Sequence, residues 1–352
     1  MSGARPNVAR CSAAMIAVAL AATQVAPPPA IAQDFYAGKT LTVISGTGPG
    51  GGHDIFARML ARHLPKHIPG APTVIVSNMP GAGGKRATDY IFNGAPKDGT
   101  TIAGVFPGPI LGPLLEDGPK DRFDPLKFQY IASGDSDTRI CATLKTSKIK
   151  TFKDIIATDA VFGSSQPGGS TFDYAHMAAN LAGAKLKVVT GYQGTPPITL
   201  AMERGEVDGL CGWGWSIFKS EKTNWKETNQ FNFLVQMSLS PEPELTALGV
   251  PDFATFVSGD KKKAAALIIS QQAFSRPYIA PPETPADRVE ILRAAFMAAL
   301  ADPALVAEFA RINIENKPLG GAELQALVAR LYATDEAIVT LAKSAQKPGG
   351  GK

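Results

Sequence analysis

Short apolar runs and amphipathic segments alternate through the first part of the chain. In the first amphipathic segment, Ile55, Met59 and Leu60 recur at the spacing of one helix face. The pattern predicts strands at 35–45, 73–77 and 101–106, and helices at 54–64 and 85–92. Strand, helix, strand, helix, strand is the order that builds a parallel α/β sheet.

The alternation restarts after residues 107–128, which are rich in proline, glycine and charge and which we interpret as a surface connection. It predicts strands at 140–144, 160–163, 186–190 and 207–211, and helices at 152–157, 172–182 and 198–204. The remainder predicts strands at 233–237 and 276–280, and helices at 261–271, 286–301, 303–310 and 321–342. Two successive α/β units in 352 residues favour two lobes over a single core.

The N-terminal 32 residues have the pattern of a secretory signal peptide. Arg5 and Arg10 make a basic start, residues 11–25 are apolar and rich in alanine, and Ala30–Ala32 forms a cleavage motif. We therefore expect cleavage after Ala32 and a periplasmic location. No later segment of the sequence approaches the roughly 18 uninterrupted apolar residues of a membrane span.

Composition adds two points to this picture. Removal of the signal peptide leaves a net charge of about +2, which is too small to indicate a nucleic-acid partner. Two cysteines remain, Cys141 and Cys211. A disulfide in an oxidising compartment and two buried free thiols are both compatible with the sequence.

Glycine-rich turns follow three of the predicted strands and precede predicted helices. They lie at 46–52, 78–84 and 164–171. Glycine lets the backbone approach a ligand closely, and the unpaired N–H groups of a helix start favour an anion. Because the first and third turns fall in different halves of the chain, they predict an anion held from two sides.

The first turn also matches a dinucleotide-binding pattern. Gly46, Gly48 and Gly51 satisfy G-x-G-x-x-G, but residues 55–88 contain no acid to contact a ribose hydroxyl. We therefore expect no nucleotide and no other cofactor. A tight turn without any ligand is the other alternative.

Taken together, these motifs resemble the Bug family, the extracytoplasmic solute-binding receptors of tripartite tricarboxylate transporters. The likeness rests on export, G-G-G-H-D at 50–54, N-M-P-G-A-G-G at 78–84 and K-D-G-T-T-I at 97–102. It covers essentially the whole chain after the signal peptide.

The resemblance implies an α/β fold of the type II periplasmic-binding class, with two lobes joined by a hinge and a ligand cleft between them. It divides the chain into a signal peptide (1–32), lobe I (33–131 plus 234–347), lobe II (132–233) and a disordered tail (348–352). It implies a small organic acid as ligand, integral membrane transporter subunits as partners, and a monomer that binds no nucleic acid.

The resemblance also assigns site residues. From the first lobe these are Gly50, Gly51, Gly52, His53, Asp54, Asn78 and Gly83, and from the second lobe Ser164, Ser165, Gly168, Gly169, Ser170 and Thr171. We add Trp213, because an aromatic ring at the cleft mouth can stack on a planar ligand. A place for Trp213 and Trp215 in the core is the alternative.

A sensor and an enzyme are the two alternative functions. An exported sensor that presents a bound carboxylate to a signalling membrane partner would use the same site. An enzyme needs a catalytic constellation, and the chain has no G-x-S-x-G motif and only four histidines. His63 and His67 are separated by Pro65 and lack a third ligand nearby in sequence, so we expect no metal site.

Overall fold

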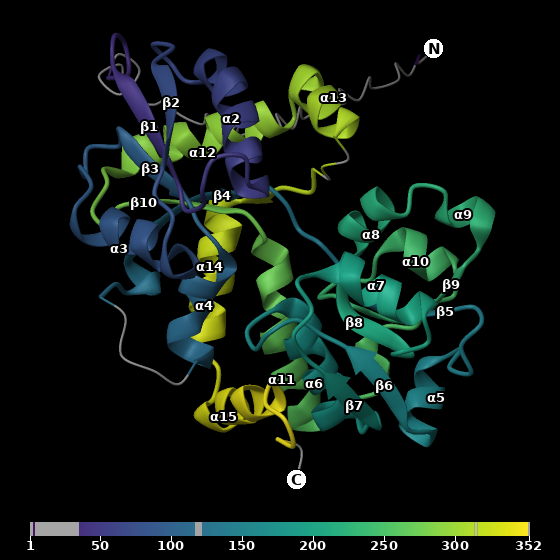
Figure 1. The fold of residues 1–352 in the computed structure, drawn as a ribbon. Coiled ribbons are helices and arrows are strands. Elements are labelled where there is room, and N and C mark those ends of the chain that lie inside the picture. Colours follow the sequence, from purple (N-terminus) through teal and green to yellow (C-terminus); the bar gives the residue numbers. More distant parts are fainter. Residues whose placement is uncertain (1–2, 4–34, 117–121, 313, 315, 351–352) are drawn as a thin grey trace.

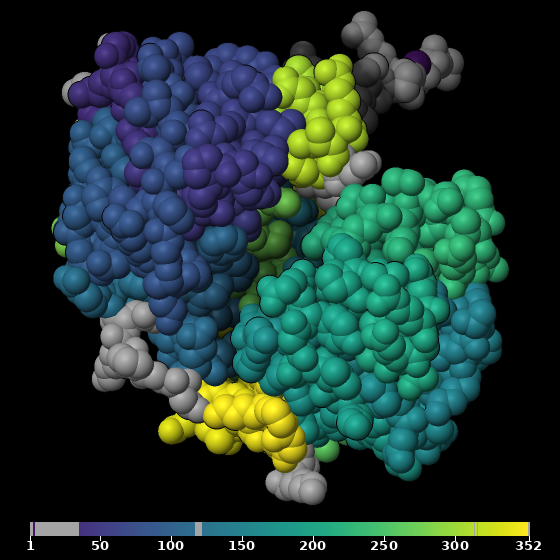
Figure 2. All heavy atoms as spheres, in the orientation of Figure 1, coloured from purple at the N-terminus to yellow at the C-terminus, as the bar shows by residue number. Residues whose placement is uncertain are grey.

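Two α/β lobes face each other across a cleft in the computed structural model, which describes residues 3, 35–116, 122–312, 314 and 316–350 (Figures 1 and 2). All of the predicted signal peptide except Gly3 lies outside these residues. Among the described helices none is long and apolar enough to cross a membrane.

The first lobe is built on a six-stranded mixed sheet. Its strands, in spatial order, are β11 (Leu319–Gly320), β4 (Gln129–Ser133), β10 (Pro277–Ala280), β3 (Thr101–Gly104), β1 (Thr40–Ser45) and β2 (Thr73–Asn78). β1, which lies beside the edge strand β2, is parallel to β2 and β3, whereas β10 runs antiparallel to β3 and β4.

Alternation along β1 explains why helices cover both faces of this sheet. Leu41 and Val43 pack with Phe56 in one core cluster, and Ile44 points into another, because successive strand residues face opposite sides. The helices of this lobe are α2 (Gly52–His63), α3 (Lys85–Asn93), α4 (Pro107–Leu115), α12 (Ala286–Leu300), α13 (Pro303–Arg311) and α14 (Gly321–Tyr332).

The second lobe repeats the plan with five strands. In spatial order these are β7 (Leu186–Val189), β6 (Ala160–Gly163), β8 (Gly209–Gly214), β5 (Arg139–Leu144) and β9 (Phe231–Met237). Its helices are α5 (Phe152–Ala157), α6 (Ser170–Ala182), α7 (Thr195–Glu203), α8 (Trp215–Glu221), α9 (Trp225–Thr228) and α10 (Pro243–Ala247). Short 3₁₀ turns lie at Leu64–His67, Ala82–Gly84, Pro125–Lys127, Phe253–Thr255 and Ser270–Phe274.

Two helices near the base of the cleft join the lobes. α11 (Gly259–Ile269) and α15 (Glu336–Ala345) pack against each other and against α6 of the second lobe. α15 also contacts α4 of the first lobe, and Figure 1 shows it bridging the two halves. The C-terminal residues 348–350 form a turn beside α15.

Several sequence predictions need correction here. Residues 107–115 of the expected surface connection form α4, whose Ile110 and Leu111 are buried; Pro107 is tolerated because it stands at the first helical position. The single helix expected at 321–342 is two helices, α14 and α15. The expected lobe boundary at 233/234 falls inside β9, which pairs with β5 through Met237.

A disulfide ties the centre of the second sheet. Cys141 on β5 is bonded to Cys211 on β8, so of the two open alternatives the structure contains the disulfide. Next to it, Gly212 has a φ of +76°, and a Cβ there would lie 2.2 Å from the carbonyl oxygen of Ser170. Glycine at this position therefore lets the sheet approach the first turn of α6.

Candidate functional site

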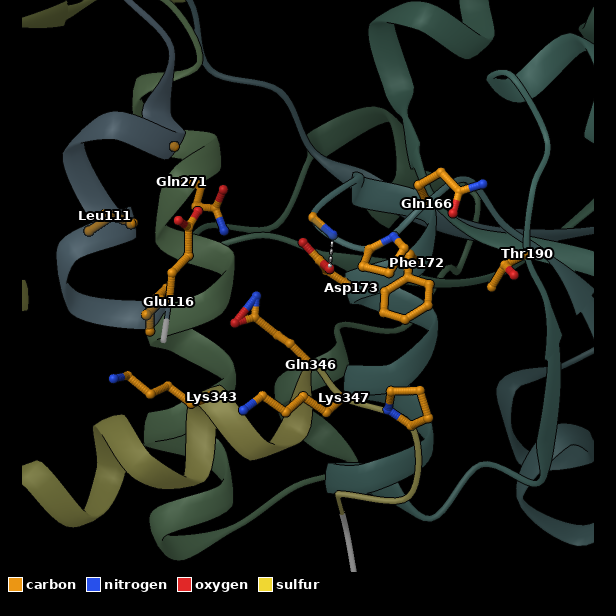
Figure 3. Close-up of a pocket in the computed structure, with 16 residues that line it drawn as sticks. Leu111, Glu116, Gln166, Phe172, Asp173, Thr190, Gln271, Lys343, Gln346 and Lys347 are labelled. Carbon is orange, nitrogen blue, oxygen red and sulfur yellow. Dashed lines mark hydrogen bonds between the residues drawn. The ribbon is translucent and has the colours of Figure 1, made fainter. Parts of the chain in front are cut away.

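Two adjoining cavities occupy the space between the lobes, where Figure 2 shows the surface hollowed. The inner cavity, about 450 Å³, is lined by residues of both lobes, among them His53, Gly83, Phe106, Arg139, Gly168, Ser170 and Gln272. The outer cavity, about 810 Å³, lies between α4, α6 and α15 (Figure 3). Both are lined by Gly108, Glu116, Gly168, Asp173 and Gln271, so they form one continuous cleft.

The turn between β1 and α2 is held from inside by Asp54. This side chain is 1% exposed and accepts hydrogen bonds from Gly50 N (2.8 Å), Arg58 Nε (2.9 Å) and Asn78 Nδ2 (2.7 Å). Burial by itself would raise the pKa of Asp54, but the bonds from Arg58, Gly50 and Asn78 outweigh it and hold the pKa below 3.8. Asp54 and Asn78 therefore shape the turn, and neither lines the cavities.

His53 is the residue of this turn that faces the cleft. Its ring packs on Phe106, with 4.3 Å between the ring centroids. Burial, assisted by the positive charge of Arg276, lowers the pKa of His53 to about 3. The imidazole is therefore neutral near pH 7 and offers one N–H donor to the cleft.

Hydroxyl groups in the second-lobe turn mostly bond one another. Thr171 Oγ1 accepts from Ser165 N and donates to Ser165 Oγ, both at 2.8 Å. The buried Ser164 hydroxyl bonds the carbonyl of Val189. These contacts fix the turn and leave Ser170 at the cavity wall, at the start of α6.

Polar side chains from β5 and from the hinge segment, the 3₁₀ turn Ser270–Phe274 between α11 and β10, complete the wall. Gln272 donates to Tyr174 Oη at 2.6 Å and accepts from Arg139 N at 3.2 Å, which ties the hinge to the second lobe. The Arg139 guanidinium is 19% exposed and pairs with Asp137 at 3.1 Å through one nitrogen. Its other N–H groups give it the capacity to grip a carboxylate.

Four of the predicted site residues line the cavities: His53, Gly83, Gly168 and Ser170. Nine others belong to the turns or to the segments beside them and line neither cavity: Gly50, Gly51, Gly52, Asp54, Asn78, Ser164, Ser165, Gly169 and Thr171. The placement of Trp213 in the site is wrong. It is 0% exposed, donates to Glu221 at 3.1 Å and packs against Phe218 and Phe231.

Several residues that line the cavities were not predicted from the sequence. Asp173 lies in the first turn of α6, directly after a predicted glycine-rich turn, so the local pattern contained that signal. Gln272, Ser275 and α4 reach the cleft through long-range packing, which no local pattern indicates.

Comparison with known proteins gives a consistent result at the level of structure. No family model matches the sequence, and no curated protein matches it. A TctC solute-binding protein from Polaromonas, solved without ligand, matches with a TM-score of 0.68 and 20% identity, over 86% of this chain and 99% of that one.

Two further solved structures agree. MatC from Rhodopseudomonas palustris with bound malate has a TM-score of 0.57 and 20% identity, over 86% of this chain and 99% of that one. The periplasmic binding protein BugD has a TM-score of 0.55 and 19% identity, over 88% and 98%. The chain therefore has the two-lobed fold of the TctC and Bug solute-binding proteins.

Proposed function

We propose that this protein is a periplasmic solute-binding protein that takes a small organic acid into the interlobe cleft. It then delivers the acid to the membrane subunits of a transporter of the tripartite tricarboxylate type. The observation that carries the proposal is that the starts of α2 and α6, one from each lobe, open onto one cavity through His53 and Ser170.

Each wall supplies donors for an anion. The first-turn N–H groups of a helix have no partner within the helix and carry partial positive charge, so the two helix starts favour a carboxylate between them. Arg139 adds a full positive charge, and the neutral His53 and the Ser170 hydroxyl add donors without opposing the anion.

The structural neighbours support the same class of ligand, since one of them was solved with malate. They are also described as solute-binding or periplasmic binding proteins, which supports a transport role and export. Malate has two carboxylates, and this cleft provides one helix start for each end of such a molecule.

Calorimetric titration against mono-, di- and tricarboxylates tests the proposal. We expect at least one acid to bind with one-to-one stoichiometry, and Ser170→Ala to weaken it about tenfold, because a hydrogen bond to a charged group contributes roughly 1.5–3 kcal/mol. Ser220→Ala is the matched control, because that serine lies on α8 and is absent from the cavity walls. Failure of every acid to bind would contradict the proposal.

A further inference from the structure

An acidic side chain stands where the proposed ligand binds. Asp173 lies in the first turn of α6 and lines both cavities. It accepts one hydrogen bond, from Gly168 N at 3.2 Å, shown dashed in Figure 3. Within the described part of the chain, no lysine, arginine or histidine forms an ion pair with it. A carboxylate beside an anion site without a cation is an unfavourable arrangement unless the ligand compensates it.

A second acid faces Asp173 from the opposite wall. Glu116 follows α4 and also lines both cavities, and Figure 3 shows it across the cavity from Asp173. Burial raises the pKa of Asp173 to about 7, against the opposing bond from Gly168, and the charge of Glu116 raises it further. Burial first, and then the charge of Glu116, therefore disfavour the ionised form of Asp173 in the empty cleft.

The cations near this acid pair are engaged with groups other than Asp173. Lys85 contacts Glu116 at 3.2 Å, and Arg139 pairs with Asp137 at 3.1 Å. Lys343 and Lys347, which line the outer cavity from the α15 side, have interaction partners of their own. His53 is neutral. Among the described residues of the cleft wall, Asp173 is therefore a carboxyl group without a cationic partner, and a ligand can supply one.

We infer that Asp173, assisted by Glu116, forms a subsite for a cationic nitrogen, so that the solute is an organic acid whose chain carries an amino group away from the carboxylate. The inference rests on the proposed function. The carboxylate is held in the inner cavity between His53, Ser170 and Arg139, and the ammonium lies where the two cavities meet.

The shape of the cleft agrees with a ligand longer than a four-carbon diacid. Between the carboxylate position and Asp173, the inner cavity of about 450 Å³ has an apolar side formed by Phe106, Pro107 and Pro109. This side accommodates the methylene chain of an amino acid, while glutamines at 166, 271 and 346 surround its polar end (Figure 3).

Proton linkage gives the two classes of ligand opposite pH dependences. Only ionised Asp173 attracts an ammonium group, so affinity for an amino acid rises as the pH increases from 6 to 8, through the Asp173 pKa of about 7. A plain diacid is repelled by the ionised form, so its affinity falls over the same range.

The test is calorimetry with chains of matched length: 5-aminopentanoate against glutarate, and 6-aminohexanoate against adipate, at pH 6, 7 and 8. We expect the amino acids to bind more tightly than the diacids at pH 8. Asp173→Asn should weaken the amino acids about tenfold or more and remove the rise with pH, since it deletes a bond between charged groups. Asp260→Asn is the matched control, because Asp260 occupies the first turn of α11 on the exposed surface.

The outcomes separate this inference from the proposed function. If diacids bind as tightly as the amino acids and Asp173→Asn leaves that ratio unchanged, the cation subsite is overturned and the organic-acid receptor stands. The same conclusion follows without a variant if the wild-type protein binds each diacid more tightly than the amino acid of matched length at every pH. If no organic acid binds, the proposed function and the inference are both overturned.

Discussion

Removal of the Asp54 carboxylate should destabilise the protein from within its first glycine-rich turn. In Asp54→Ala, Gly50 N and the Asn78 amide lose a charged acceptor in a site where Asp54 is 1% exposed. Each such bond contributes roughly 1.5–3 kcal/mol. The Arg58 side chain is 45% exposed, so its pair with Asp54 adds at most about 1 kcal/mol. Because the three bonds share one carboxylate, their contributions are not additive, and we expect a loss at the lower end of their sum, about 3–5 kcal/mol in the free energy of unfolding.

Urea denaturation followed by circular dichroism measures this loss, and calorimetry should show a melting temperature lower by about 6–10 °C. Arg58→Ala is the control, since it removes only the exposed partner and should cost about 1 kcal/mol or less. The stabilisation by Asp54 should also depend on pH, and its direction can be predicted. Because the pKa of Asp54 is lowered in the folded state, its stabilisation is present above 3.8 and disappears as the pH falls through the folded-state pKa.

The difference between wild type and Asp54→Asn should therefore shrink in acid. An Asp54→Ala protein as stable as the wild type would refute the view that Asp54 builds the turn. Asp54 would then be available to the ligand.

Three further predictions test other parts of the structure. Trp213→Ala should lower the free energy of unfolding by about 3–5 kcal/mol, measured by urea denaturation, because the ring fills the core behind the cleft. The order of ligand affinities should stay unchanged; a changed order with intact stability would show that Trp213 contacts the ligand. Replacement of Cys141 and Cys211 by alanine should lower stability by about 2–4 kcal/mol, since the disulfide closes a 70-residue separation, and an unchanged melting temperature would contradict this. Small-angle scattering should show a smaller radius of gyration with a saturating acid, as the lobes close about their hinge, whereas a constant radius with bound ligand would exclude closure.

The sequence predicts the parts of this site that depend on local order. A strand that ends in glycines before a helix places His53, Gly168 and Ser170 at helix starts, and these residues line the cleft. Trp213 follows the same alternation but is buried by an aromatic cluster that includes Phe218 and Phe231, which come from later segments.

In the fold, too, the sequence predicts what depends on neighbouring segments and does not predict what depends on contacts between distant ones. The order of strands and helices indicates two α/β lobes, because each unit is assembled from neighbouring segments. The return of β10 into the first sheet and the packing of α4 along the cleft depend on contacts between distant segments. Helix propensity does not predict α4, because Pro107 and Pro113 lie within it and proline has the lowest helix propensity.

The central claim is that one organic acid is held by helix starts from both lobes. Hydrogen exchange with mass spectrometry tests it directly, by comparing the empty protein with protein saturated by the tightest-binding acid of the calorimetric panel. We expect slower exchange in two segments together, the start of α2 at 52–56 and the start of α6 at 170–174. Protection in only one of these segments would contradict it. So would protection confined to a separate cavity of the second lobe, which Lys145 and Trp225 line.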